Sequence, residues 1–205
     1  RILRRLHLRK FRQTLPHRRP HRKKLQLLHR QKLLHRSRQK KPVLSPVGAY
    51  YAEGLAPVKI MVEDEYVRAV QGGTGFTKCG GNYAGSIIGQ VKAEKYGCSQ
   101  VLWLDGRERK YVEEVGAMNI MFKIDGEIYT APIEGTVLPG VTRDSIIHIL
   151  KDWGYKVNET HLSVDDLMQA GRDGRLEEAY GTGTAAAVSP VGALVYNGQE
   201  ITSNN

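Results

Sequence analysis

The most informative segment of the chain is GGTGFTKCGGNY, residues 72–83. It places a single lysine, Lys78, among glycines and continues into Asn82 and Tyr83. Glycine clusters favour neither helix nor strand, so this segment predicts a rigid, tightly turned loop that holds one amine in place. An amine in a partly dry pocket has a lowered pKa and becomes a nucleophile toward carbonyl groups. The ordinary alternative is a turn lysine in solvent, and the rest of the chain decides between the two.

The net charge of the chain is unevenly distributed. Residues 1–41 contain 17 Lys and Arg residues, no acidic residue and 5 of the 7 His residues. The remaining residues, 42–205, contain 14 basic and 21 acidic residues, so the +10 of the whole chain hides a net charge of −7 in this part. We therefore expect a basic segment at 1–41, a linker at 42–57 and a globular domain at 58–205.

The basic segment has three interpretations. Clusters of Lys and Arg neutralise phosphates and release counterions, which is typical of a disordered nucleic-acid-binding arm. Transit peptides are also Arg-rich and acid-poor, but they are rich in serine, and this segment contains only Ser37. Repeated Arg, His, Gln and Leu without a core pattern are typical of an out-of-frame sequence joined to a real domain. The segment is expected to be disordered or irregular and outside the fold.

Cysteine content and hydropathy exclude two classes of protein. Cys79 and Cys98 are too few for a disulfide framework, and they indicate a reducing, cytoplasmic location. No apolar run approaches the roughly 20 residues of a membrane span, so we expect no membrane partner. We expect no metal site either.

The apolar pattern predicts more strands than helices, and the strands come in hairpins. Asp125-Gly126 and Asn197-Gly198 are strong hairpin signals, and Ser163 begins a helix-capping box. Strands are expected at 58–62, 101–104, 119–123, 127–130, 185–188 and 193–196, and helices at 84–96, 142–153 and directly after the capping box. This pattern predicts an α+β fold with mixed, mostly antiparallel sheets and flanking helices, rather than a doubly wound nucleotide fold.

Four segments could meet around one cofactor. Lys78 supplies an amine, and Glu114 supplies a carboxylate where the chain enters an apolar strand. Residues 138–142 lead into a helix, whose first N–H groups attract an anion such as phosphate. Residues 181–185 form a small-residue turn that could approach a second anion. Each segment alone has an ordinary explanation, but an amine, a carboxylate and phosphate donors together are what pyridoxal phosphate requires.

Residues 43–205 resemble the branched-chain amino acid aminotransferases, which are fold-type IV pyridoxal-phosphate enzymes. The matching motifs are PVGAYY (46–51), GGTGFTKCGGNYAGS (72–86), QVLWLDG (100–106), EEVGAMNI (113–120), GTVLPGVTRDS (135–145) and YGTGTAAAVSPVGALVYNG (180–198). The resemblance implies the large, C-terminal domain of that fold and pyridoxal 5'-phosphate as the cofactor.

The resemblance also implies a role for each site residue. Lys78 would form the Schiff base with the cofactor and act as the base of the 1,3-proton transfer. Tyr83 would hydrogen-bond the cofactor's phenolic oxygen, and Glu114 would pair with its ring nitrogen and keep it protonated. The expected cofactor-binding residues are Lys78, Tyr83, Glu114, Leu138, Val141, Thr142 and Thr184, and the expected substrate-binding residues are Tyr50, Ala117, Thr184 and Ala185.

The implied reaction is a ping-pong transamination of leucine, isoleucine or valine with 2-oxoglutarate, which yields a branched 2-oxo acid and glutamate. A homodimer is implied for the intact enzyme. Two alternatives keep the fold, a D-amino acid transaminase and an aminodeoxychorismate lyase, although the GGNY and EEVGAMN motifs argue against both. An alternative of another class is nucleic-acid binding through residues 1–41, which a salt-dependent affinity lost on their deletion would support.

The chain departs from the family's pattern at both ends. Family members carry a small N-terminal domain that residues 1–41 do not resemble, and a C-terminal tail after the last hairpin. We therefore expect a C-terminally truncated fragment with little or no turnover. The CxxC redox pair of the animal enzymes would fall at Ala186 and Ser189, which indicates a bacterial-type enzyme.

Overall fold

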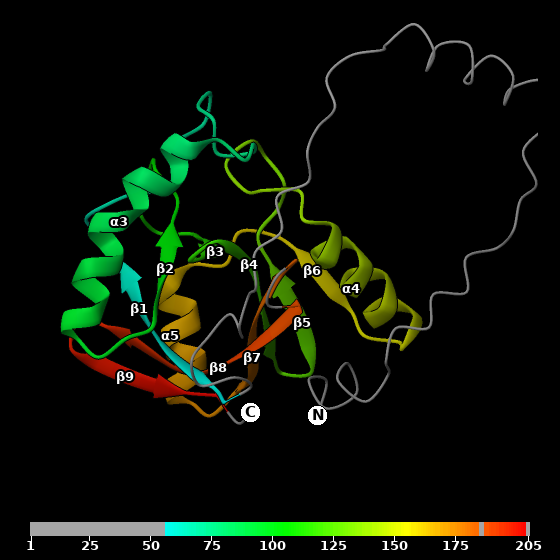
Figure 1. The fold of residues 1–205 in the computed structure, drawn as a ribbon. Coiled ribbons are helices and arrows are strands. Elements are labelled where there is room, and N and C mark those ends of the chain that lie inside the picture. Colours follow the sequence, from blue (N-terminus) through cyan, green and yellow to red (C-terminus); the bar gives the residue numbers. More distant parts are fainter. Residues whose placement is uncertain (1–55, 185–186, 204–205) are drawn as a thin grey trace, which may run out of the picture. The chain divides into compact units, whose positions relative to one another are not determined.

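The computed structural model describes residues 56–184 and 187–203 of the chain (Figure 1). The predictions for the basic segment 1–41, for most of the linker, and for Tyr50 and Ala185 lie outside the described residues. Within the described ranges, no helix is long and apolar enough to cross a membrane.

The centre of the fold is a closed ring of six strands. Its members are β1 (Val58–Glu63), β2 (Gln100–Leu104), β3 (Val112–Val115), β4 (Met118–Ile124), β7 (Leu176–Gly183) and β8 (Ala187–Tyr196). They pair in the order β3-β2-β1-β8-β7-β4, and a further pairing of β3 with β4 closes the ring. This closure brings the ends of β3, β4 and β7 together, because Asn119 pairs with both Glu114 and Thr182.

Three further strands extend the ring into one nine-stranded sheet. β5 (Glu127–Thr130) pairs with β4, β6 (Val157–Glu159) with β5, and β9 (Gln199–Thr202) with β8. β1 runs parallel to β2 and β8, and β5 parallel to β6, while the other pairs are antiparallel. The predicted α+β fold with a mixed, mostly antiparallel sheet is confirmed.

Side chains alternate between the inside and the outside of the ring, as the period of a strand requires. Ile60 and Val62 belong to the inner core, whereas Met61 between them faces outward. Helix α5 (Val164–Arg172) packs Leu167 and Met168 against the inner core.

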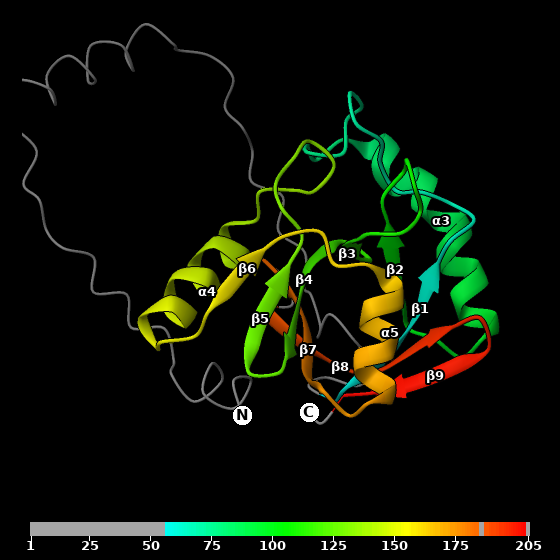
Figure 2. The ribbon, with the colours of Figure 1, turned by 180° about the vertical axis from the view of Figure 1, so that it is seen from behind.

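Two other helices cover the outer face of the sheet. Ala93 of α3 (Gly80–Lys95) packs with the outward side chains of β1 and β2, including Trp103. Ile146 and Leu150 of α4 (Val141–Asp152) pack with Met121 and other outward side chains of β4, β5 and β7. Figure 1 shows α3 and α4 on opposite flanks of the sheet, and the view from behind in Figure 2 shows α5 between them.

Predictions that rest on local backbone chemistry are confirmed. Asp125 and Gly126 both have a positive φ, as a two-residue hairpin turn between β4 and β5 requires. The Ser163 hydroxyl accepts the N–H of Asp166 at 3.0 Å and caps α5.

Two element predictions are wrong, and the strands β3, β6 and β7 were not predicted. Helix α3 begins at Gly80 rather than residue 84; the low helix propensity of glycine hid this first turn in the sequence. β8 is one strand of 10 residues where two were expected, since Pro190 and Gly192 interrupt its apolar pattern. β7 was not predicted, because its acidic and glycine residues hide the alternation of a strand.

Candidate active site

The loop before α3 presents Lys78 and is held by one side chain of the helix. Asn82, which is 8% exposed, donates through Nδ2 to the carbonyl oxygens of Thr74 at 2.8 Å and Thr77 at 2.9 Å. Its Oδ1 accepts the Thr74 hydroxyl at 2.7 Å. The loop is therefore tightly turned, as expected, but it is fixed by Asn82, to which the motif alone assigned no role.

The amine of Lys78 has no competing partner in the part of the chain that the structure describes. The structure records no hydrogen bond or ion pair for its Nζ among residues 56–184 and 187–203. The Lys78 side chain is exposed, however, so the partly dry pocket expected from the sequence is not formed by these residues. Lys78 lines a cavity of about 280 Å³.

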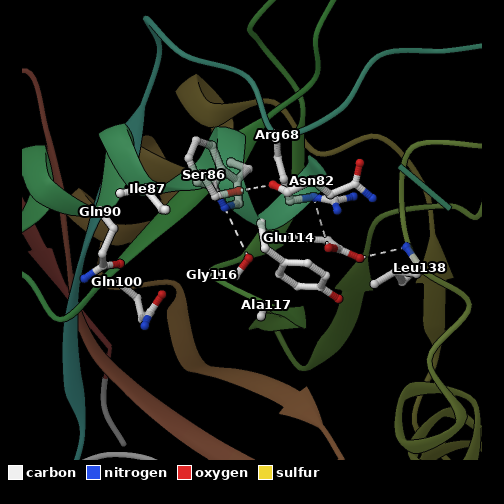
Figure 3. Close-up of a pocket in the computed structure, with 12 residues that line it drawn as sticks. Arg68, Asn82, Ser86, Ile87, Gln90, Gln100, Glu114, Gly116, Ala117 and Leu138 are labelled. Carbon is white, nitrogen blue, oxygen red and sulfur yellow. Dashed lines mark hydrogen bonds and ion pairs between the residues drawn. The ribbon is translucent and has the colours of Figure 1, made fainter. Parts of the chain in front are cut away.

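Glu114 contributes a buried carboxylate to the same cavity. It is 1% exposed, and its Oε1 accepts the Leu138 N–H at 2.8 Å and Asn119 Nδ2 at 3.1 Å. Its Oε2 lies 3.1 Å from Nε of Arg68. In Figure 3 the carboxylate lies between the Arg68 side chain and Leu138.

The surroundings of Glu114 make it a weak acid. Burial raises the pKa of this carboxyl to about 7, although Arg68, the Leu138 N–H and Lys78 favour the charged form and oppose the rise. The neighbouring Glu113 raises the pKa further. Glu114 can therefore change its protonation state near neutral pH.

Arg68 is a site residue that the sequence motifs did not reveal. It is 8% exposed and lies in the loop after β1, where its Nη2 donates to the carbonyl oxygens of Gly75 at 3.3 Å and of Thr136. The only available signal was a lone arginine between Val67 and Ala69. Its partners are distant in sequence, so no local spacing could have identified it.

The start of α4 forms a cradle for an anion. Its N-cap is Gly140, which has no side chain to cap the helix, and the first residue, Val141, is 81% exposed. The first N–H groups of a helix have no intrahelical acceptor, and they favour negative charge. Donors at Val141 and Thr142 therefore lie at the edge of the cavity that Lys78 lines.

Asn119 connects this cradle to Glu114. Besides its bond to Glu114, its Nδ2 donates to the carbonyl oxygen of Leu138 at 2.9 Å. A Cβ on Gly140 would lie 2.1 Å from Asn119 Oδ1, so only glycine fits there. Asn119 thus holds the carboxylate and the cradle at a fixed spacing, a role that its motif did not indicate.

The cavity brings together most of the residues expected at the site, namely Lys78, Glu114, Ala117, Leu138, Val141, Thr142 and Thr184. Tyr83 lines an adjoining cavity of about 220 Å³, which is drawn in Figure 3 and shares Glu114, Ala117 and Leu138 with the first. Tyr50 and Ala185 lie outside the described residues.

The donor set of the cavity fits pyridoxal phosphate. It combines an unpaired amine, a carboxylate and a helix N-terminus, which suit the aldehyde, the ring nitrogen and the phosphate of this cofactor. Among the described residues, Oε1 of Glu114 accepts two hydrogen bonds and Oε2 accepts none, so Oε2 is free to accept a ring N–H. Among the described residues, the buried hydroxyl of Thr182 also has no hydrogen-bond partner.

Comparisons with known proteins agree with this donor set. The model of the family "Amino-transferase class IV" matches residues 62–194. The chain is 58% identical over 163 residues to branched-chain-amino-acid aminotransferase 2 of Bacillus subtilis (strain 168), covering 80% of this chain and 45% of that protein. It is 55% identical over 164 residues to a probable branched-chain-amino-acid aminotransferase of Staphylococcus aureus (strain N315), covering 80% and 46%. The chain thus spans less than half the length of these relatives.

Solved structures show the same relationship. The branched-chain amino acid aminotransferase of Escherichia coli matches with a TM-score of 0.66 and 31% identity, over 78% of this chain and 50% of that one. The T.th. branched-chain amino acid aminotransferase complexed with N-(5'-phosphopyridoxyl)-L-glutamate matches with a TM-score of 0.60 and 32% identity, over 72% and 46%.

Proposed function

Because the chain belongs to the class IV aminotransferases, we propose that it contains the cofactor-binding part of an enzyme that transaminates branched-chain amino acids. Leucine, isoleucine or valine would react with 2-oxoglutarate to give a branched 2-oxo acid and glutamate. The observation that carries the proposal is a single cavity lined by Lys78, Glu114 and the start of α4. The names of the relatives in two bacteria supply the substrate class.

Each part of pyridoxal phosphate is assigned to a different residue of the site. Lys78 Nζ would provide the covalent attachment, and the N–H groups of Val141 and Thr142 would bind the phosphate together with Thr184, which lines the same cavity. Glu114 would accept the N–H of the ring nitrogen, and Tyr83 would donate to the phenolic oxygen. The Leu138 backbone holds the Glu114 carboxylate in place through its N–H.

Once bound, pyridoxal phosphate supplies an electron sink for the charge that develops at the substrate α-carbon. Lys78 Nζ would accept the proton that leaves this carbon and would release it in the second half of the transfer. Glu114 in its charged form keeps the ring nitrogen protonated. Arg68 and the Leu138 N–H stabilise that charged form.

Substrate contacts and assembly are proposed from the relatives. Ala117 and Thr184, with Tyr50 and Ala185, would contact the amino acid or 2-oxo acid. The intact enzyme would be a homodimer, and the free cysteines Cys79 and Cys98 suit a cytoplasmic enzyme. No described residue favours a D-amino acid transaminase or an aminodeoxychorismate lyase. Nucleic-acid binding would depend on residues 1–41, which lie outside the described residues.

Trapping of the cofactor tests the proposal. The purified chain is mixed with pyridoxal phosphate, reduced with borohydride and digested, and the labelled lysine is identified by mass spectrometry. We expect the label on Lys78, its loss in Lys78→Ala, and no change in Lys95→Ala, a matched exposed lysine at the far end of α3. A label spread over surface lysines, with equal yield in Lys78→Ala, would reject the assignment.

A further inference from the structure

We propose that Arg68 is a positioning residue that keeps the Glu114 carboxylate charged and in place for the ring nitrogen of the cofactor. This inference rests on the proposed function and adds a residue to its machinery. Arg68 lines the adjoining cavity of Tyr83 rather than the cavity of Lys78, and it is ion-paired with Glu114, so it would act through Glu114 rather than on the substrate.

The first support is geometric. Arg68 Nε lies 3.1 Å from Glu114 Oε2, and within the described part of the chain it belongs to the only cationic side chain within 4 Å of the carboxylate. Its Nη2 is anchored on the carbonyl oxygens of Gly75 and Thr136, so the guanidinium cannot swing away from Glu114. A planar guanidinium has enough donors in fixed directions to contact one carboxylate and two carbonyl oxygens at once, whereas an ammonium group does not.

Arg68 also joins the carboxylate to the loop that presents the amine. Gly75, three residues before Lys78, accepts from Arg68, and a Cβ there would lie 2.7 Å from the Thr136 oxygen. The loop therefore packs directly on the anchor of the guanidinium. One side chain thus fixes the relative positions of Glu114 and the segment that carries Lys78.

The second support is electrostatic. Two carboxyl groups, Glu113 and Glu114, follow each other on β3 and are both buried, and burial disfavours the charged form of each. Two cations oppose this at Glu114, Arg68 and Lys78, and Arg68 has the larger effect. Lys78 is exposed to solvent, which screens its charge. The neutral groups at the carboxylate, Asn119 and the Leu138 N–H, donate hydrogen bonds but add no charge.

Loss of Arg68 would therefore leave Glu114 protonated at neutral pH. A protonated carboxyl group donates a hydrogen bond instead of accepting one with full charge, so it no longer holds a proton on the ring nitrogen. The cofactor could still attach to Lys78 in such a variant, but its ring nitrogen would be unprotonated. This separates the role of Arg68 from the role of Lys78.

The test begins with the full chain before cofactor is added. The Glu114 carboxyl is titrated by ¹³C NMR with glutamate labelled at the carboxyl carbon, and its signal is assigned by its loss in Glu114→Gln. We expect a midpoint near pH 7 in the original chain and one higher by about 1 to 3 pH units in Arg68→Met. Arg143→Met is the matched control, because Arg143 is also buried, donates to a carbonyl oxygen and pairs with Glu159, away from Glu114.

Two further variants separate charge from packing. Arg68→Lys keeps the charge but loses the fork of donors, and Arg68→Gln keeps a donor but loses the charge. We expect the Glu114 midpoint of Arg68→Lys to stay near that of the original chain and that of Arg68→Gln to rise as in Arg68→Met. Arg68→Gln decides the question if Arg68→Met does not fold. A Glu114 midpoint unchanged in Arg68→Gln would overturn the inference.

The loaded protein gives the second readout. With pyridoxal phosphate labelled with ¹⁵N in the ring, we expect a protonated nitrogen in the original chain and an unprotonated one in Arg68→Gln at the same pH. Both should carry the borohydride-trapped label on Lys78. A missing label in the original chain would reject the proposed function, while the Glu114 titration before loading would still decide the effect of Arg68.

Discussion

Asn82 and Thr74 bind each other twice: the Asn82 amide donates to the Thr74 carbonyl oxygen at 2.8 Å, and its oxygen accepts the Thr74 hydroxyl at 2.7 Å. This reciprocal pair closes the loop that carries Lys78 onto the first turn of α3. The position of the amine is therefore set by a side chain four residues after it. A helix packed on the sheet is a firmer support than a loop alone.

Asn82→Ala tests this support. Loss of the amide removes three hydrogen bonds between α3 and the loop. Each is worth about 0.5–1.5 kcal/mol, and water can replace part of them at the exposed Thr74 and Thr77, so the cost is about 1–3 kcal/mol. We expect a free energy of unfolding lower by about that amount in urea titrations, and a slower labelling of Lys78 by pyridoxal phosphate. Asn158→Ala removes an amide bond to Glu127 on β5 and is the control. Equal labelling rates in the two variants would contradict the role given to Asn82.

The raised pKa of Glu114 predicts that stability falls as the pH rises from about 4.5 to about 7. Burial raises its pKa in the folded chain to about 7, above the value of about 4.5 expected on unfolding. The stability from the neutral form is then complete below about pH 4.5 and is lost as the pH approaches 7, by at most about 3 kcal/mol. Urea titrations between about pH 5 and 8 measure this slope. It should be smaller in Glu114→Gln, and an equal slope in both chains would contradict the prediction.

The lowered pKa of Asp105 predicts the opposite pH dependence of stability: stability falls as the pH falls in acid. Burial raises its pKa, but the N–H groups of Glu108, Tyr111, Lys110 and Arg107 outweigh that effect and lower it to about 2. The stabilisation is present above the usual value near 3.8 and is lost as pH falls through about 2. We expect Asp105→Asn to cost about 1–2 kcal/mol at pH 7, allowing for partial exposure, and to cost much less near pH 2. Denaturation of both chains at the two pH values tests this, and an equal loss at both would refute it.

Gly140→Ala should damage the anion cradle. Its Cβ would meet Asn119 Oδ1 at 2.1 Å, so Asn119 or the turn before α4 must move. We expect weaker binding of pyridoxal phosphate, measured by fluorescence, and a loss of stability of about 1–3 kcal/mol. Gly85→Ala is the matched control, because no atom lies within 4 Å of its added Cβ on α3. That variant should gain about 0.5–1 kcal/mol. Unchanged cofactor affinity in Gly140→Ala would contradict the assignment of the cradle.

The features that were predictable from sequence are those coded within a few residues. The Asp125-Gly126 turn and the Ser163 cap depend only on local backbone chemistry, so their residue types indicated them. The residue types of the site, Lys78 and Glu114 among them, were indicated by motif spacing and by the resemblance to a family. β7 was missed because its place in the sheet comes from pairing with β4 and β8, not from its own pattern.

The supports of the site could not be predicted in the same way. Arg68 bonds to Thr136, which is 68 residues away, and the Leu138 N–H bonds to Glu114 across 24 residues. Such contacts arise from the packing of loops that are distant in sequence, and no spacing in a single sequence encodes them. The exposure of Lys78 was missed for the same reason, since burial depends on every segment that packs around a loop.

The two consecutive glutamates make the site depend on the register of β3. Glu114 points to the cavity of Lys78, while Glu113 bonds to Thr136 and lines a separate cavity of about 740 Å³. A shift of β3 by one residue would exchange the two carboxyl groups without changing the composition of the site. The length of the connection from β2 sets this register. The Asp105 carboxylate accepts hydrogen bonds from four backbone N–H groups of that connection. An insertion of one residue there would place the wrong acid beside the cofactor, in a protein whose every functional side chain is still present.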